Sequence, residues 1–226
     1  RRVLFRSGSF IVKIFMGPDI QEMLQPMRRA FKAAMNPEEL AHRVEDMRVV
    51  IKHVGHDTGL PNAHFCAYKG VGPNAVVNNT TCRRADGEKE VPMEALASQQ
   101  PRALYILLGT NVLTADNDYS SFLTYYRLML DMISQALPNT KIYVQSITPV
   151  RPEVREKHPG LYKERLCQIN DELAAIALEK NCVFLNLWEV LADENGDLKA
   201  EYAQPDGYHV KPDGYSVWVE YLAAHT

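Results

Sequence analysis

Near the end of the chain, the stretch QPDGYHVKPDGY places an aspartate and a histidine three positions apart, and these two residue types can act together in acyl transfer. An imidazole that accepts a proton from a nucleophile needs its other nitrogen held by a carboxylate, which fixes the tautomer and stabilises the charged ring. Asp206 and His209 could supply both groups from one glycine-containing turn. A solvated turn explains most isolated Asp-x-x-His pairs. A catalytic role for this pair is therefore favoured by its position, after the last predicted strand and just before the last predicted helix.

Two further polar features follow predicted strands. The run AHFCAYK ends at Gly70, whose backbone N–H can approach a ligand because no Cβ intervenes. The run ALYILL is followed by Gly109 and Thr110 and then by Asn111, whose side-chain amide could donate a hydrogen bond in a pocket. A plain turn glycine and a turn-capping asparagine are the structural alternatives for these two residues.

The elements that would position these groups are clearest in the second half of the chain. Short apolar runs at 102–109, 141–147 and 182–188 read as strands, and the segments 119–137, 161–180 and 212–225 have helical periodicity. This alternation predicts an α/β fold, a three-layer α/β/α sandwich with a mostly parallel sheet of about five strands. In such sheets ligands bind at the carboxyl ends of the strands, which is where Gly70 and Asn111 are expected.

The first half of the chain is less regular. Strands are predicted at RVLF (2–5), RVVIKHV (48–54) and AHFCAYK (63–69), and helices at 19–35 and 37–47, the first of them kinked at Pro26. The glycine- and asparagine-rich segment 70–81 is predicted to be a loop.

Composition limits the classes of function. The chain has 226 residues and 46% hydrophobic content, which suits one domain spanning residues 1–226. The 28 acidic and 25 basic residues are mixed along the chain, so no basic face for nucleic acid is expected. No apolar run approaches the roughly 20 residues that span a bilayer, so no membrane span is expected. The four cysteines have no CxxC spacing, and neither a metal site nor a disulfide framework is predicted.

From about Ala63 to its end, the chain resembles the SGNH, or GDSL-type, hydrolase family. The segment AHFCAYKGVG resembles the family's oxyanion glycine block, LLGTNVL its oxyanion asparagine block, and DGYHVKPDGY its Asp-x-x-His block. KIYVQSITPVRP and the stretch 169–198 also resemble bacterial members. The resemblance implies an SGNH hydrolase-like, flavodoxin-like fold. It departs from the family at Val112, where an aspartate usually follows the asparagine.

The second departure concerns the nucleophile, since no Gly-Asp-Ser occurs in the sequence. Aligning RSGS with the family's serine block makes Ser9 the nucleophile, closing a strand at RVLF and opening a helix at Phe10. A rival alignment, based on the distance to Gly70, places the block at RVEDMRVV and leaves Met47 where the serine belongs. A thioether cannot attack an ester, so that alignment leaves no nucleophile. Ser7 and Ser9 could also be polar residues of a frayed N-terminal segment.

The resemblance implies a serine esterase acting on a small acyl ester of a carbohydrate, a lipid or a simple alcohol. Its catalytic residues would be Ser9, Asp206 and His209, and its oxyanion hole would include Gly70 and Asn111, with no cofactor and no metal. Two alternatives remain open: a catalytically inactive member that binds a glycan or acylated ligand, and an acyltransferase. Since the chain starts without Met, it suggests a fragment or a processed product. A bacterial envelope or secreted location and a cytoplasmic one are both compatible with it, and the sequence predicts no oligomeric state.

Overall fold

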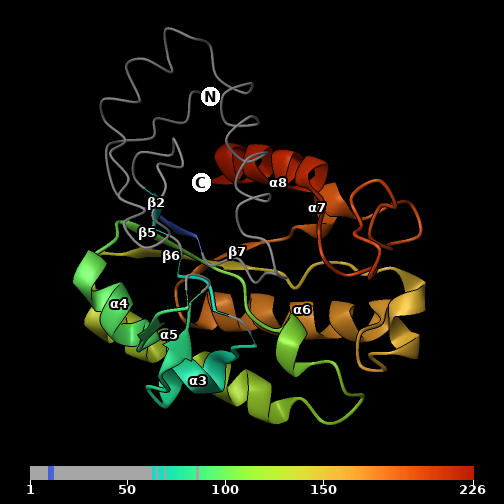
Figure 1. Cartoon of the computed structure of the whole chain (residues 1–226). Coiled ribbons are helices and arrows are strands. Elements are labelled where there is room, and N and C mark those ends of the chain that lie inside the picture. Colours follow the sequence, from blue (N-terminus) through green and yellow to red (C-terminus); the bar gives the residue numbers. More distant parts are fainter. Residues whose placement is uncertain (1–9, 13–62, 65, 69, 85–86) are drawn as a thin grey trace, which may run out of the picture.

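The sheet at the centre of the fold has five strands, all paired in parallel. A computed structural model of the chain describes residues 10–12, 63–64, 66–68, 70–84 and 87–226 (Figure 1). The strand order is β2-β1-β5-β6-β7. The strands are β1 (Phe10–Val12), β2 (Ala63–His64), β5 (Ala103–Ile106), β6 (Lys141–Gln145) and β7 (Val183–Leu185).

Helices cover both faces of this sheet. Alternate residues of β5 and β6 point to opposite faces, as the period of two along a strand requires. Leu104 and Ile106 face one apolar cluster, whereas Ala103 and Tyr105 face the other. Figure 1 shows α8 on one side of the sheet and α5 and α6 on the other. The helices are α3 (Pro73–Val77), α4 (Pro92–Gln99), α5 (Ser120–Ala136), α6 (Lys163–Glu179), α7 (Trp188–Leu191) and α8 (Pro212–His225). The predicted α/β sandwich is therefore confirmed.

Three smaller features lie outside these layers. β3 (Cys82–Arg83) and β4 (Lys89–Glu90) pair antiparallel as a separate ribbon. Two short 3₁₀ helices, η1 (Thr110–Val112) and η2 (Pro152–Glu156), follow β5 and β6 respectively. Among the described residues, no helix is both long and apolar enough to span a bilayer.

Two predictions for the first half need correction. The segment 70–81 is not a loop throughout, because Pro73–Val77 forms α3 with proline in its first turn, where a missing N–H is no loss. Phe10–Val12 is a strand, although a helix was predicted to open at Phe10. An aromatic residue followed by two β-branched ones favours a strand there. The strands predicted at 2–5 and 48–54 and the helices predicted at 19–35 and 37–47 lie outside the described residues.

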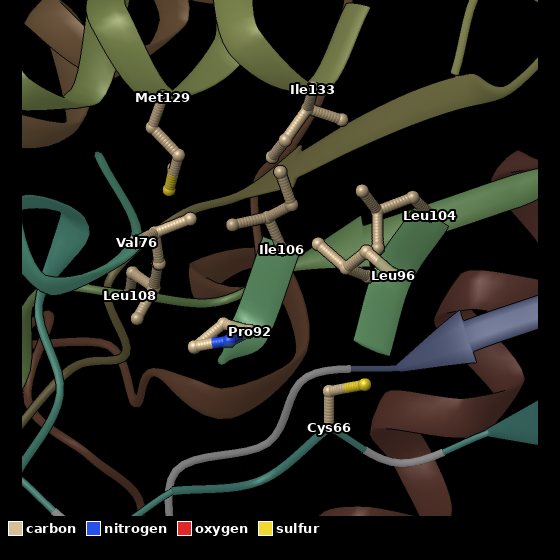
Figure 2. Close-up of a pocket in the computed structure, with 9 residues that line it drawn as sticks. All are labelled: Cys66, Val76, Pro92, Leu96, Leu104, Ile106, Leu108, Met129 and Ile133. Carbon is tan, nitrogen blue, oxygen red and sulfur yellow. The ribbon is translucent and has the colours of Figure 1, made fainter. Parts of the chain in front are cut away.

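The larger apolar cluster encloses a small cavity between the sheet and the helices α3, α4 and α5 (Figure 2). Its lining is apolar apart from one thiol, and none of the four predicted site residues that the structure describes (Gly70, Asn111, Asp206 and His209) belongs to it. The lining residues are Cys66, Val76, Pro92, Leu96, Leu104, Ile106, Leu108, Met129 and Ile133. This cavity is a space within the packed core, and the candidate site must be sought at the strand ends.

A buried asparagine ties α6 to the end of β6. Asn170 accepts a hydrogen bond from the N–H of Ile147 at 2.8 Å and donates one to the Ile147 carbonyl at 3.1 Å. Trp188 Nε1 also donates to that carbonyl at 2.7 Å, so the carbonyl has a second donor. The Ile147 N–H, in contrast, has no acceptor other than Asn170 among the described residues. Ile147 itself is fully buried.

Asn170→Leu is therefore expected to lower the free energy of unfolding by about 1–3 kcal/mol, the usual cost of leaving a buried donor unpaired. Urea denaturation measures this difference. Gln168→Leu, at an exposed position of the same helix, is the matched control and is expected to change stability little. Equal stability of the two variants would contradict the assigned role of Asn170.

Candidate active site

The Asp206 and His209 side chains form a hydrogen-bonded pair. Asp206 Oδ2 lies 2.5 Å from His209 Nδ1. The other carboxylate oxygen, Oδ1, accepts the backbone N–H of Tyr208 at 3.2 Å and that of His209 at 3.0 Å. Backbone amides of the same short turn therefore hold the carboxylate in place beside the imidazole. His209 Nε2 makes no hydrogen bond to any of the described residues, and 29% of the side chain is exposed.

The turn that carries this pair rests on the segment after β6. Gln204 and His209 close it through a 2.8 Å hydrogen bond from the Gln204 N–H to the His209 carbonyl. The Gly207 carbonyl accepts the N–H of Arg151 at 2.8 Å, and a Cβ at Gly207 would lie 2.7 Å from a methyl group of Val154. Asp206 and His209 are therefore held close to the chain that leaves the carboxyl end of β6.

The electrostatics of the turn favour an ionised carboxylate. Burial alone would raise the pKa of Asp206, but the hydrogen bonds from the His209 ring and from the backbone of His209 and Tyr208, with the charge of His209, lower it below its ordinary value. The pKa of the Tyr208 phenol is raised by burial and by the charge of Asp206. The pair therefore presents a carboxylate to the imidazole, beside a phenol that keeps its proton.

This lowered pKa predicts a pH-dependent difference between the wild type and Asp206→Asn. A carboxylate with a depressed folded-state pKa contributes stability above its unfolded pKa of about 3.9 and loses it as the pH falls through the folded value. The wild type is therefore expected to be more stable than Asp206→Asn near pH 6, with the difference shrinking as the pH falls below about 4. Urea denaturation from pH 2 to 7 measures it. A difference that stays constant over this range would show that the charge of Asp206 contributes nothing.

Asn111 lies in η1, directly beyond the carboxyl end of β5. Gly109 makes the bend possible, since its φ of +154° disfavours other residues and a Cβ there would lie 2.7 Å from the Ile147 side chain. The Val112 N–H donates to the Gly109 carbonyl at 2.9 Å and closes the turn. The Asn111 side chain is exposed and makes no hydrogen bond to any described residue, so it does not cap the turn.

The loop that carries Gly70 lies beside the Asn111 loop. Gly70 is exposed, has a φ of +71° and follows the chain that leaves β2. Two residues on, a Cβ at Gly72 would lie 2.6 Å from one methyl group of Val112 and 3.4 Å from the other. The fold therefore brings the two predicted oxyanion segments together at one edge of the sheet. Val112, which stands where the family usually has aspartate, fills the space between them.

Ser9 lies outside the described residues, and so does Met47 of the rival alignment. What the structure does describe is the strand that follows Ser9, since β1 begins at Phe10. Phe10 pairs with Ala103, the first residue of β5, whereas Asn111 lies five residues beyond Ile106, the last residue of that strand. Within the described ranges no group of His, Cys, Asp and Glu side chains has the arrangement of a metal site.

Three side chains near this edge were not identified from the sequence. The Tyr208 ring lies 4.3 Å from the His209 ring, and the His158 ring packs edge-on against Tyr208 with its centre 5.3 Å away. Arg165, on α6, is 4% exposed and reaches into the loop that follows Asn111. Arg165 had a signal in the sequence, because it lies four residues before Ile169 on the apolar face of its helix. For His158 the only signal in the sequence was its place in the polar, proline-bounded segment 151–160, between a predicted strand and a predicted helix.

Comparison with known proteins gives one family match over most of the chain. The profile of the GDSL-like lipase/acylhydrolase family matches residues 59–217. That range includes the four predicted site residues Gly70, Asn111, Asp206 and His209 and begins after Ser9.

Several solved structures share the fold at low sequence identity. A Streptococcus pneumonia protein that bears the name platelet activating factor is 17% identical, with 99% of this chain and 86% of that chain covered and a TM-score of 0.64. A GDSL-like lipase from Bacteroides thetaiotaomicron is 14% identical (96% and 86% covered, TM-score 0.56). A carbohydrate esterase of family 3 from Talaromyces cellulolyticus is 12% identical (96% and 95% covered, TM-score 0.60).

A second, local similarity is of a different kind. The chain is 42% identical over 55 residues to ribosomal RNA large subunit methyltransferase E of Nitratidesulfovibrio vulgaris, which is 24% of this chain and 27% of that protein. The chain thus spans about a quarter of the length of the curated relatives it matches. A match of this extent shows a shared segment and assigns no activity.

Proposed function

Because the chain belongs to the GDSL-like lipase/acylhydrolase family, we propose that it hydrolyses a small acyl ester through a covalent acyl-enzyme. The observation that carries the proposal is the 2.5 Å contact between Asp206 Oδ2 and His209 Nδ1, with the remaining carboxylate oxygen held by two backbone amides. This arrangement fixes one imidazole nitrogen and leaves Nε2 to exchange a proton with a nucleophile.

Generic acyl-transfer chemistry assigns the steps. His209 Nε2 takes the proton of a serine hydroxyl as the oxygen attacks the ester carbonyl, and Asp206 stabilises the imidazolium that forms. The Asn111 amide and the Gly70 N–H donate to the oxyanion of the tetrahedral intermediate. His209 then returns the proton to the leaving alcohol. Water, activated by the same histidine, releases the acid and restores the serine. These steps need no metal and no organic cofactor.

The family and the structures of similar fold favour an ester of a small acyl group as the substrate. Acylated carbohydrates, lipids and simple esters are the candidates, and a carbohydrate esterase is among the proteins of the same fold. The Tyr208 ring, whose centre lies 4.3 Å from that of His209 and which His158 contacts edge-on, is an aromatic group beside the proposed base that could pack against a sugar ring or an acyl chain.

Ser9 is the proposed nucleophile, and the register of β1 bears on this assignment. Phe10, the residue that follows Ser9 in the sequence, is the first residue of β1 and pairs with Ala103 at the amino end of β5, whereas Asn111 follows the carboxyl end of β5. Three strand residues span roughly 10 Å. This order favours a second candidate function, in which the chain lacks a nucleophile and binds an acylated ligand or a glycan without turning it over.

Labelling with a fluorophosphonate separates the two candidates. The wild type, Ser9→Ala and His209→Gln are incubated with the probe, and any modified peptide is mapped by mass spectrometry. Modification at Ser9 that is lost in both variants is expected if the acyl-enzyme proposal holds. Modification of another serine would assign the role of nucleophile to that residue and would leave the proposed acyl-enzyme mechanism unchanged. A folded protein that takes up no probe and hydrolyses no p-nitrophenyl ester would overturn the proposal in favour of ligand binding.

For an active protein, the acyltransferase alternative is tested by adding an alcohol acceptor to the ester assay. Hydrolysis predicts that the free acid remains the main product as the acceptor concentration rises. Acyl transfer predicts that a new ester replaces the acid.

A further inference from the structure

We infer that Arg165 is a positioning residue, which fixes the loop carrying Asn111 relative to the turn carrying His209. The inference deepens the proposed function, and its kinetic part rests on that function. Arg165 lies near the start of α6, touches none of the proposed reacting atoms and would act through the two segments that it joins.

The guanidinium of Arg165 binds three carbonyl groups from two different loops. Nη1 donates to the Leu113 carbonyl at 3.0 Å and to the Gly160 carbonyl at 2.7 Å. Nη2 donates to the Asn117 carbonyl at 2.9 Å. The Asp116 carboxylate lies 3.6 Å from Nε, so the buried cation also has a counter-charge. Two of the carbonyls and the carboxylate belong to residues 113–117, which directly follow Asn111 and Val112.

The third carbonyl belongs to what we name the bridging segment, residues 151–160. This segment contacts the Asn111 loop on one side, where the Gly160 N–H donates to the Thr114 carbonyl at 2.9 Å. A Cβ at Gly160 would lie only 2.2 Å from the carbonyl oxygens of Leu113 and Ala115. The two backbones therefore touch directly, and the guanidinium holds them from the helix side.

The bridging segment contacts the His209 turn on its other side. Its first residue, Arg151, donates its N–H to the Gly207 carbonyl, and His158 packs against Tyr208. One chain of contacts therefore runs from the Asn111 loop through Arg165 and the bridging segment to the turn of Asp206 and His209. Oxyanion donors stabilise a transition state only when they are held in place, and a shift of about 1 Å can cost up to 100-fold in rate.

Lysine cannot replace this group, although it keeps the charge. Its ammonium is a point charge with three donors, whereas the planar guanidinium donates in fixed directions to several acceptors at once. Arg165→Lys should therefore leave at least one of the three carbonyls without its donor while still neutralising Asp116. Arg165→Met would leave all three carbonyls without a donor and Asp116 without its counter-charge, which threatens folding, so the lysine variant decides the test.

The kinetic test compares Arg165→Lys with the wild type on a p-nitrophenyl ester. We expect kcat to fall roughly 10- to 100-fold with little change in KM or in the pH profile, because the Asp206 and His209 pair stays intact. Asn111→Ala is expected to cost roughly 100- to 1000-fold in kcat. If Arg165 acts through Asn111, adding Arg165→Lys to Asn111→Ala should cost little more. A full additional loss in the double variant, or an unchanged kcat in the single one, would overturn the inference.

Hydrogen exchange tests the same inference without any activity. Arg165→Lys is expected to speed exchange of the Gly160 amide, which donates to Thr114, and of the amides of residues 113–117. Arg127→Lys is the matched control, because Arg127 pairs with Glu179 at an exposed position between α5 and α6. Unchanged exchange in Arg165→Lys would overturn the positioning role. Altered exchange in a protein that is inactive even as wild type would reject the proposed function alone.

Discussion

His209→Gln is expected to lower kcat for ester hydrolysis by roughly 10⁴- to 10⁶-fold, the range seen when a catalytic histidine is removed from a serine hydrolase. Glutamine can occupy the space and can donate a hydrogen bond from its side-chain amide to the Asp206 carboxylate, but it cannot take up a proton at neutral pH. The fold is expected to persist, since 29% of the His209 side chain is exposed and the turn is held by backbone hydrogen bonds. Initial rates on a p-nitrophenyl ester, with circular dichroism to check folding, measure the effect.

His225→Gln provides the matched control. His225 also carries a hydrogen bond on Nδ1, from which it contacts the Tyr221 carbonyl at 2.8 Å, and it stacks on the Tyr221 ring. It lies at the far end of α8, about 20 Å along the helix axis from Pro212. This variant is expected to keep the wild-type rate. If His209→Gln loses less than tenfold, His209 is not the base and the mechanism proposed for the turn fails.

The second half of the fold was predictable because its periodicity is strong. Helix α6 lies within the predicted segment 161–180, and its buried residues recur at helical spacing from Leu166 through Ile169 to Leu173. The strands β5 and β6 begin within one residue of the predicted starts. The predicted membership of the GDSL-type hydrolase family is confirmed, and it rested on three short blocks in the correct order.

The first strand could not be located because periodicity fails over such short runs. RVLF and FIV are both short and apolar, and no local feature of the sequence shows that FIV forms the strand between β2 and β5. Pairing with partners more than 50 residues away along the chain decides this, with Phe10 opposite Ala63 and Ala103. The assignment of Ser9 depended on that strand, so it stays a prediction.

The roles of Arg165 and Gly160 could likewise not be predicted from the sequence, because these roles arise only from tertiary contacts. An arginine on an apolar helix face is a visible anomaly, but its three carbonyl partners come from loops 5 to 52 residues away along the chain. Gly160 follows a proline in a polar loop and reads as an ordinary turn residue. Only the approach of two backbones shows why a side chain is excluded there.

Gly160→Ala is therefore expected to lower the free energy of unfolding by at least about 3 kcal/mol, at or beyond the upper end of the usual cost of overpacking. The added methyl group would lie 2.2 Å from two carbonyl oxygens, and backbone atoms cannot move aside as a flexible side chain can. Relief requires the bridging segment and the Asn111 loop to separate, which would also break the 2.9 Å hydrogen bond between Gly160 and Thr114. Urea denaturation measures the loss of stability.

Gly87→Ala separates this contact effect from backbone strain. Gly87 has a φ of +90°, yet a Cβ there would meet no described residue within 4 Å, whereas Gly160 is not in the left-handed region and is crowded. Alanine at position 87 should cost about 1–2 kcal/mol through φ alone. If Gly160→Ala proves no more destabilising than Gly87→Ala, the two backbones do not touch as described. If it is more destabilising and also speeds exchange at residues 113–117, steric separation of the loops and removal of the Arg165 donors act on the same contact.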